Sequence, residues 1–220
     1  MKLVRIPLVL LVLSVALVTL LKWVPVRYTP VMLKRTLQFR SDKNYRTEQE
    51  WVTLDAISAD LVKAVITAED NRFYMHHGFD FPEMKAMWQS HRTTGSRLRG
   101  CSTISQQTAK NVFTFGTRSY ARKIMENYWT ALIELIWGKE RIMEVYLNVV
   151  EWGYGIYGSE MASREYFGSA ARTLRTKQAA AMAVCLPKPL LERPDHLTPG
   201  QKRRCSRIIG QLPLVKHSNH

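Results

Sequence analysis

Cysteine is scarce in this sequence, and the few that occur exclude a disulfide framework. Cys101, Cys185 and Cys205 are an odd number in a chain of 220 residues, so at most one intramolecular bridge can form. We expect three buried thiols and leave open whether two of them pair. Internal repeats and low-complexity tracts are also absent. With 46% hydrophobic residues, the chain has too much apolar content for a disordered protein, so it should fold.

Acidic residues are missing from a long internal stretch. Residues 84–125 contain no Asp or Glu, although the chain as a whole carries a net charge of +14, or +10 without the four basic residues of its first 27. This balance predicts an anionic partner: lipid headgroups, a phosphate-bearing substrate or, formally, nucleic acid. The basic residues of the stretch are Lys85, Arg92, Arg97, Arg99, Lys110, Arg118, Arg122 and Lys123.

One long apolar run opens the chain. Residues 6–21 contain no charge, and extension to residue 26 adds only Lys22, whose stem can reach the interface beside Trp23. A helix over residues 6–26 spans about 30 Å, so we expect an uncleaved transmembrane anchor. A cleaved signal peptide is the competing interpretation, but no small-residue cleavage site follows the run. We therefore predict an amino-terminal tip and anchor in residues 1–27, a connector in 28–55 and one domain in 56–220.

The rest of the sequence favours a mainly α domain. Helical periodicity predicts a helix from about Ser58 to Glu69, one through residues 101–113, and one from Ser119 to Trp137 that ends at Gly138. The last has two apolar faces and one polar strip, so we expect it to be mostly buried. Further helices are predicted in residues 139–150, 159–166 and 176–186. No alternating strand pattern stands out, and residues 95–100 are expected to form a loop.

Individual acidic residues have ordinary explanations when taken alone. Glu69 and Asp70 could be a solvated helix end, and His76 and His77 lack the ligand spacing of a zinc site. Glu126 is more informative because it lies on the single polar strip of an apolar helix. Arg122 and Lys123 precede it by one turn, which fits either anion binding or an intrahelical ion pair worth about 0.3–0.5 kcal/mol.

Five motifs occur in a fixed order and together resemble the peptidoglycan glycosyltransferases, family 51. They are E-D-x-x-F-x-x-H-x-G in residues 69–78, G-x-S-T-I-x-Q-Q-x-x-K-N in 100–111, R-K-x-x-E in 122–126, KERIMEVYLN in 139–148, and G-x-G-I-Y-G in 153–158 followed by YFG. The chain departs from the pattern at Ser105, where threonine is common, and at Arg175. Its basic segment around Arg204 resembles the family's terminal arginine region only loosely. No Ser-x-x-Lys occurs, so a transpeptidase site is excluded.

The resemblance implies a lysozyme-like glycosyltransferase domain that polymerises lipid II into β-1,4 glycan strands for the cell wall. The reaction inverts configuration and releases undecaprenyl pyrophosphate. The catalytic residues would be Glu69, as general base with a pKa raised by burial, and Glu126 on the donor side. By analogy with inverting glycosidases, the two carboxylates should lie about 6.5–9.5 Å apart or more. The implied substrate-binding residues are Asp70, Phe73, His76, Thr103, Gln106, Gln107, Lys110, Asn111, Arg122 and Lys123, among which Asp70, Phe73 and His76 shape the site rather than react.

The resemblance also implies where the protein acts and with what. No organic cofactor is expected, whereas Mg²⁺ or Mn²⁺ could join Glu126 to the pyrophosphate. The domain would face the periplasm from a bacterial inner membrane, crossed once, with cell wall synthesis or divisome proteins as partners. Met84, Met87 and Trp88 could enter the membrane interface or belong to the core. A lysozyme-like hydrolase or lytic transglycosylase is the nearest alternative; a membrane-anchored scaffold or nucleic-acid protein would leave Glu69 and Glu126 without a role.

Overall fold

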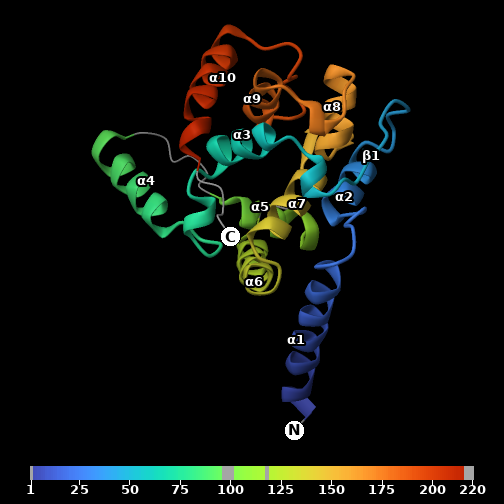
Figure 1. Ribbon diagram of the computed structural model, residues 1–220. Helices are drawn as coiled ribbons and strands as arrows, with labels where there is room; N and C mark the ends of the chain where they lie inside the picture. The colour runs from blue at the N-terminus through green and yellow to red at the C-terminus, as the bar shows by residue number, and fades with distance from the viewer. Residues whose placement is uncertain (1, 96–101, 117–118, 216–220) are drawn as a thin grey trace.

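Helices make up most of the computed structural model, which describes residues 2–95, 102–116 and 119–215 (Figure 1). The expectation of a mainly α fold is confirmed. The expected loop at residues 95–100, apart from Gly95, and Cys101 lie outside the described residues. The helices are α1 (Lys2–Leu21), α2 (Pro30–Gln38), α3 (Ala59–Glu69), α4 (Phe81–Thr94), α5 (Ile104–Phe113), α6 (Tyr120–Ile136), α7 (Lys139–Val149), α8 (Ser159–Phe167), α9 (Thr176–Cys185) and α10 (Pro199–Gln211).

The core forms where the central helices meet. Helix α5 packs against α6 and α7, α3 packs against α9, and α9 packs against α10. The small side chains of α9 allow this close approach, and Ala179, Ala180 and Ala183 are fully buried. Between α5 and α6, the rings of Phe113 and Trp129 stack with centroids 4.3 Å apart. The predicted helices therefore surround one shared apolar centre.

The residues that begin α3 and α6 are those that the sequence predicted. Ser58 is the N-cap of α3, and Ser119 caps α6 by accepting a hydrogen bond from the backbone N–H of Arg122. Helix α6 ends at Ile136, before Trp137 and Gly138, and Gly138 has the positive φ of 76° that glycine favours. Helices α7, α8 and α9 also lie within one residue of their predicted limits.

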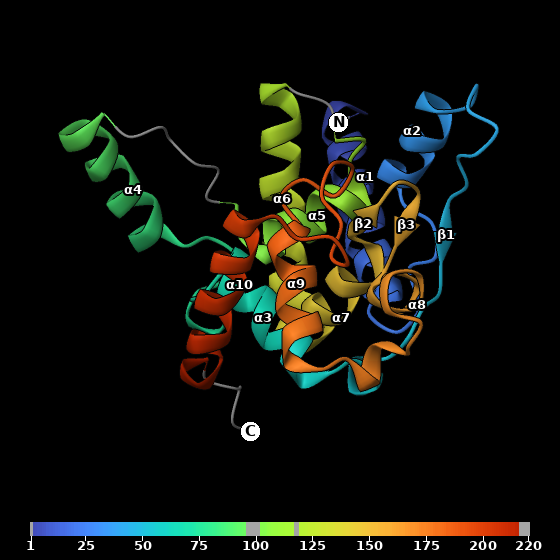
Figure 2. The same cartoon turned by 90° about the horizontal axis from the view of Figure 1, so that it is seen from above.

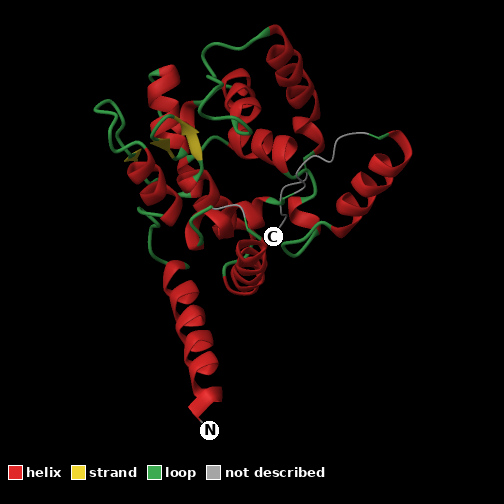
Figure 3. Ribbon diagram, turned by 180° about the vertical axis from the view of Figure 1, so that it is seen from behind, coloured by secondary structure: helices red, strands yellow, loops and turns green. Residues whose placement is uncertain are grey.

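Three helices and a small sheet were not predicted. Helix α2 lies inside the expected connector, where no helix was predicted, and helices α4 and α10 were missed. The strands β1 (Glu48–Gln49), β2 (Glu151–Gly153) and β3 (Ile156–Tyr157) form one sheet in the order β1-β3-β2 (Figure 3). Strand β3 pairs parallel to β1 and antiparallel to β2. Strands of two or three residues are too short to show alternation in a sequence.

Helix α6 turns polar side chains inward and leaves several large apolar side chains exposed. Two residues of its polar strip face inward, Glu126 at 2% and Thr130 at 0% exposed, whereas Asn127 of the same strip is exposed. Its apolar outer face is open, with Ile124 and Leu135 at 70% and 83% exposed. The prediction of a mostly buried helix is therefore wrong. The inward polar groups are tolerated because they find partners in the fold, as the Thr130 hydroxyl does by donating to the backbone carbonyl of Glu126.

Helix α1 extends away from the other helices but is fastened to them at its carboxyl-terminal half (Figure 1). Trp137 Nε1 donates a 2.7 Å hydrogen bond to the backbone carbonyl of Val18, and Arg141 donates to the carbonyls of Leu21 and Val24 at 2.7 and 2.6 Å. Ser14 is hydrogen-bonded to Tyr128 of α6. Within the described residues, no helix combines the length and the apolar character that crossing a membrane requires.

Candidate active site

Glu69 is the last residue of α3, and its side chain points toward α5. Gln107 of α5 donates a 2.8 Å hydrogen bond from Nε2 to the Glu69 carboxylate. The other end of the same amide, Oε1, accepts a 3.3 Å hydrogen bond from the hydroxyl of Tyr146, a fully buried residue of α7. Three helices therefore set the position of one carboxylate. Tyr146 lies in a motif that the sequence analysis quoted, but it was given no role there.

The environment of Glu69 raises the pKa of its carboxyl group. Burial is the largest cause; the hydrogen bond from Gln107 and the charges of Arg204 and Lys110 act in the opposite direction, and the charge of Asp70 raises the pKa slightly. The expected effect of burial on this pKa is confirmed. Arg204 of α10, whose role the sequence left open, is thus electrostatically coupled to Glu69.

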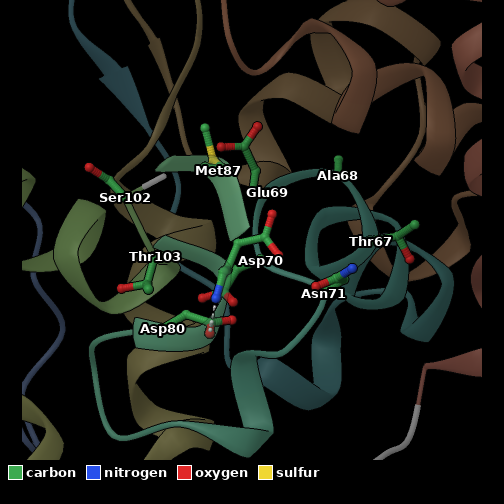
Figure 4. A pocket seen from close by; sticks show the side chains of 10 residues that line it. Thr67, Ala68, Glu69, Asp70, Asn71, Asp80, Met87, Ser102 and Thr103 are labelled. Atoms are coloured by element: carbon green, nitrogen blue, oxygen red, sulfur yellow. Dashed lines mark hydrogen bonds between the residues drawn. The ribbon is translucent and has the colours of Figure 1, made fainter. Parts of the chain in front are cut away.

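Asp70, His76 and Phe73 hold the turn that follows Glu69. One Asp70 carboxylate oxygen accepts a 3.0 Å hydrogen bond from the backbone N–H of Ile104, at the start of α5, and His76 Nε2 lies 3.0 Å from the other. Phe73 is fully buried, with the Lys139 ammonium 4.5 Å above its ring. Figure 4 shows Asp70 beside Glu69 at the cavity wall. These contacts are all made within the protein, and a role of the three residues in shaping a substrate site stays a prediction.

Thr103 and Gln106 form the capping box of α5. The Thr103 hydroxyl accepts from the backbone N–H of Gln106 at 3.1 Å and donates to the carbonyl of Gly78 at 2.7 Å. Gln106 accepts from the backbone N–H of Thr103 at 3.1 Å and donates to Asn127 at 3.3 Å. All of these partners belong to the protein, so a substrate contact by either side chain stays a prediction.

Glu126 lies in a cluster of cations. Arg122 donates to one of its carboxylate oxygens, and Lys123 donates to the other at 2.6 Å. The Glu126 side chain is 3% exposed, whereas those of Arg122 and Lys123 are 22% and 42% exposed. The intrahelical ion pairs considered from the sequence are therefore formed, and the two cations still reach the surface.

Lys110 connects the two carboxylates. Its pKa is lowered, chiefly by burial, while the charges of Glu126 and Glu69 raise it and those of Arg122 and Lys123 lower it. Lys110 also lines one cavity with Glu69 and Gln107. The structure thus brings together Glu69, Gln107, Lys110, Glu126, Arg122 and Lys123 around one centre.

Two cavities meet at Glu69. One, of about 220 Å³, is lined by Asp70, Asp80 and Thr103, together with Met87 of α4 (Figure 4). The other, of about 350 Å³, is lined by Gln107, Lys110 and Asn111 from α5, together with Lys34 and Arg35 from α2. These two α2 cations were missed because no helix was predicted within the connector. Thr29 before Pro30 is the start signal that could have revealed it.

The described residues offer little to a metal ion. Asp70, His76 and Asp80 are the one described group of three potential ligands within 4.8 Å of one another. Their oxygens already have protein partners, including Arg72, whose Nε lies 3.1 Å from Asp80. Both Glu126 oxygens also carry cations. The donor set therefore does not fit a resident divalent ion, and the expectation of Mg²⁺ or Mn²⁺ stays a prediction.

The two cysteines among the described residues form no disulfide bond. Cys185 and Cys205 are free and buried. Burial raises the pKa of the Cys185 thiol to about 12, so this group is inert at neutral pH. The expectation of buried thiols is confirmed for these two cysteines.

Comparisons with known proteins agree with these motifs. The transglycosylase family model matches residues 34–212, a range that begins inside the predicted connector. Proteins named biosynthetic peptidoglycan transglycosylase are similar to the chain: 44% identical over 91% of this chain and 82% of the relative from Bdellovibrio bacteriovorus. The relative from Rhodospirillum centenum is 42% identical over 94% and 87%, and that from Chromohalobacter salexigens 49% over 80% and 76%. The chain therefore belongs to the transglycosylase family.

Proposed function

We propose that this protein is a peptidoglycan glycosyltransferase that polymerises lipid II into β-1,4 glycan strands for cell wall synthesis. The observation that supports it most is that Glu69 and Lys110 line one cavity, while Glu126 on the neighbouring helix holds Arg122 and Lys123. A reaction that expels a pyrophosphate needs a base for the incoming hydroxyl and positive charge for the leaving group. The centre supplies both. Inversion follows from a single displacement in which the two act on opposite faces of the sugar.

Glu69 is the general base in this proposal. It takes the proton of the acceptor 4-hydroxyl while C1 of the growing glycan is attacked. Burial raises the pKa of Glu69 toward neutral pH, and this makes its carboxylate a better proton acceptor than that of an ordinary glutamate. Gln107 fixes the orientation of the carboxylate through its 2.8 Å hydrogen bond. Because Tyr146 holds the other end of the amide, Gln107 presents its N–H group to Glu69.

The cations stabilise the leaving pyrophosphate. Lys110, Arg122 and Lys123 surround Glu126, and a guanidinium group can bind phosphate oxygens in a bidentate manner. Glu126 keeps this cluster assembled before the substrate arrives, because its two oxygens hold Arg122 and Lys123. Lys34 and Arg35 extend the positive wall along the second cavity. Should Mg²⁺ or Mn²⁺ take part, it would enter with the phosphate oxygens of the substrate.

The apolar amino terminus supports a membrane location. We propose that residues 6–26 anchor the chain once in the bacterial inner membrane, with the domain of residues 56–220 in the periplasm. The side chains of α1 are largely open to the surroundings, as for Leu8 at 59% and Leu20 at 59% exposed. Hydrocarbon would cover them at lower free energy than water. Recruitment by other cell wall synthesis or divisome proteins belongs to the same proposal.

Incubation of the full chain with purified lipid II tests the function. Glycan polymer with released pyrophosphate carrier supports a synthase, whereas shortening of preformed glycan would indicate the hydrolase or lytic transglycosylase. Glu69→Gln should reduce polymerisation by about 10²-fold or more, the scale of a lost general base. Glu165→Gln, at an exposed site on α8, serves as the matched control and should retain full activity. A Glu69→Gln variant with unchanged turnover would refute the base assignment.

A further inference from the structure

An apolar groove runs between α1 and α6. It has a volume of about 540 Å³ and is lined almost entirely by hydrocarbon and aromatic surface. In Figure 1 α6 is seen nearly end-on beside the length of α1, and Figure 2, from above, shows α6 along its length. The groove therefore lies in the corner where the two helices cross. We call it the α1–α6 groove; its walls are Pro7, Leu10, Leu11, Leu13, Ser14 and Leu17 of α1 and Met125, Tyr128 and Trp129 of α6.

The two walls of the groove are held together by polar contacts. Ser14 and Tyr128, both in the wall, are hydrogen-bonded to each other, and Trp137 fixes the backbone of Val18 one turn further along α1. A Ser–Tyr contact inside an apolar surface sets the position of one helix against the other, because each group would be costly to leave without a partner. The groove is thus part of the folded structure rather than a chance gap beside a flexible leader.

One end of the groove adjoins the cation cluster. Arg122 precedes Met125 by three residues and Trp129 by seven, so the three side chains follow one side of α6. Arg122 Nε and Trp129 Nε1 are buried and have no hydrogen-bond partner among the described residues. Both groups can only donate hydrogen bonds. The cations Arg122 and Lys123 therefore lie toward one end of an otherwise apolar channel, and Trp129 lies about two helical turns further along it.

We infer that the α1–α6 groove binds the isoprenoid chain of the lipid-linked substrate whose pyrophosphate lies at Arg122 and Lys123. This inference rests on the proposed function and adds a site for the hydrocarbon part of the substrate. A polyprenyl pyrophosphate is complementary to this surface: its anionic head suits the cations Arg122 and Lys123, and its long branched apolar chain suits the groove. The chain leaves the cluster along Met125 and Trp129 and continues beside Leu10, Leu13 and Leu17 of α1.

Photolabelling of the full chain in detergent micelles tests this site. The probe is a long-chain polyprenyl pyrophosphate that carries a diazirine on its isoprenoid chain and no sugar. Label should fall on peptides containing Leu10–Leu17 and Met125–Trp129. An excess of unlabelled polyprenyl pyrophosphate should reduce it by about tenfold, as competition for one site requires, whereas phosphatidylglycerol at the same concentration should leave it nearly unchanged.

A pair of tryptophan substitutions on α1 provides the matched control. Leu10→Trp fills the groove and should lower labelling by about fivefold. Val12→Trp places the same ring two residues away, outside the groove wall, and should have no effect; the two positions are 61% and 58% exposed, so neither change disturbs the core. Thermal unfolding of both variants at the wild-type temperature checks the fold.

The outcomes distinguish failure of the proposed isoprenoid site from failure of the proposed function. Equal competition by phospholipid, label outside both peptides, or equal loss in the Leu10→Trp and Val12→Trp variants would each overturn the groove. Because the probe carries no sugar, groove labelling without lipid II polymerisation would instead refute the proposed function and leave the isoprenoid site standing. Polymerisation with label elsewhere would do the reverse.

Discussion

Glu69 is the residue on which opposing electrostatic effects meet. Burial raises the pKa of its carboxyl group, while Gln107, Arg204 and Lys110 lower it. Because burial has the larger effect, the Glu69 carboxyl group stays neutral to a higher pH than that of an ordinary glutamate. Each of the three opposing groups can be removed by a single substitution. The position of the acid limb of the pH–rate profile therefore reports which groups contact Glu69.

Replacing Gln107 by Leu should shift that limb. The hydrogen bond from Gln107 stabilises the charged carboxylate, so its loss raises the pKa of Glu69 further and moves the acid limb of kcat/KM to higher pH. Initial rates of lipid II polymerisation between pH 5 and pH 9 measure this. Tyr146→Phe, which removes only the group that orients Gln107, should give a smaller shift in the same direction. An unmoved limb in both variants would show that Gln107 does not act through Glu69.

Replacing Glu69 by Gln should stabilise the fold at neutral pH. The folded-state pKa of Glu69 lies above its ordinary value of 4.5, so its contribution to stability is present below that value and lost as pH rises through the raised pKa. At pH 7 the wild type therefore bears the cost of a partly buried charge. The variant should melt about 2 °C higher at pH 7 and show little gain near pH 4, by calorimetry. Exposed Glu165→Gln should show no gain at either pH.

At the scale of elements, the start of α5 ties the two halves of the site together. Its N-cap, Thr103, donates to Gly78 after the Glu69 turn, and the backbone N–H of Ile104 donates to Asp70. Gly78 has φ of 89°, and a Cβ there would lie 2.9 Å from Thr130 of α6. A glycine is required because the turn has both a left-handed backbone and no space for a side chain.

Replacing Thr103 by Ala tests whether this residue is chiefly structural. Loss of a capping hydroxyl costs about 1–2 kcal/mol, which lowers Tm by about 2–6 °C in a chain of this size. Thr103→Ser keeps the hydroxyl and should restore both Tm and polymerisation. Thermal unfolding with a parallel activity assay measures both. A variant that keeps its Tm but loses affinity for lipid II would instead support the predicted substrate contact.

The sequence was informative about elements that bury an apolar stripe and uninformative about the others. Helices α3, α5, α7 and α9 follow their periodicity because that stripe forms the core. Helix α4 buries none of its residues and α10 buries only Cys205 and Ile208, so neither produced a clear stripe. Their caps were readable, however: Asp80 before Pro82 and Thr198 before Pro199 are start signals. For α6 the periodicity separated the faces correctly but could not tell which of them points inward.

The candidate site was predictable to the extent that motifs carry it. The family resemblance brought Glu69, Glu126 and the cations together, and in the structure the charges of both carboxylates act on Lys110. Single residues gave no sign of the three-helix chain from Tyr146 through Gln107 to Glu69, because it depends on how α7 packs behind α5. Lys34 and Arg35 were likewise beyond periodicity, since their approach to the cavity requires the packing of α2 against α5.

At the scale of the whole molecule, α1 and the domain form a connected unit. Arg141 of α7 donates to the carbonyl of Leu21, the last residue of α1, and to that of Val24 just after the helix, and neither carbonyl has a further helical turn to satisfy it. If these carbonyls had no partner in the domain, α1 could rotate about the segment that joins it to the domain. Their hydrogen bonds to Arg141 restrict that rotation. Side chains of the domain thus set the orientation of α1 relative to the two cavities at Glu69.

Replacing Arg141 by Met should loosen this connection without unfolding the domain. The variant loses its charge-assisted hydrogen bonds to α1 but keeps most of the apolar contact over Trp51, above whose ring the guanidinium lies 5.1 Å away. Hydrogen exchange of residues 22–29 should accelerate by about tenfold or more, while α5 and α9 keep their protection. Arg172→Met, at an exposed site, is the control. Unchanged exchange in residues 22–29 would show that other contacts hold α1.

The reversed polarity of α6 has a practical consequence. A helix that turns carboxylate and hydroxyl groups inward and shows Ile124, Leu135 and Tyr120 to its surroundings is inside out by the standard of a water-soluble protein. Without detergent, folded molecules of the protein would associate with one another through these exposed apolar side chains. A purified sample would then be lost on storage by aggregation of folded molecules. The choice of detergent would affect this loss more than the free energy of unfolding does.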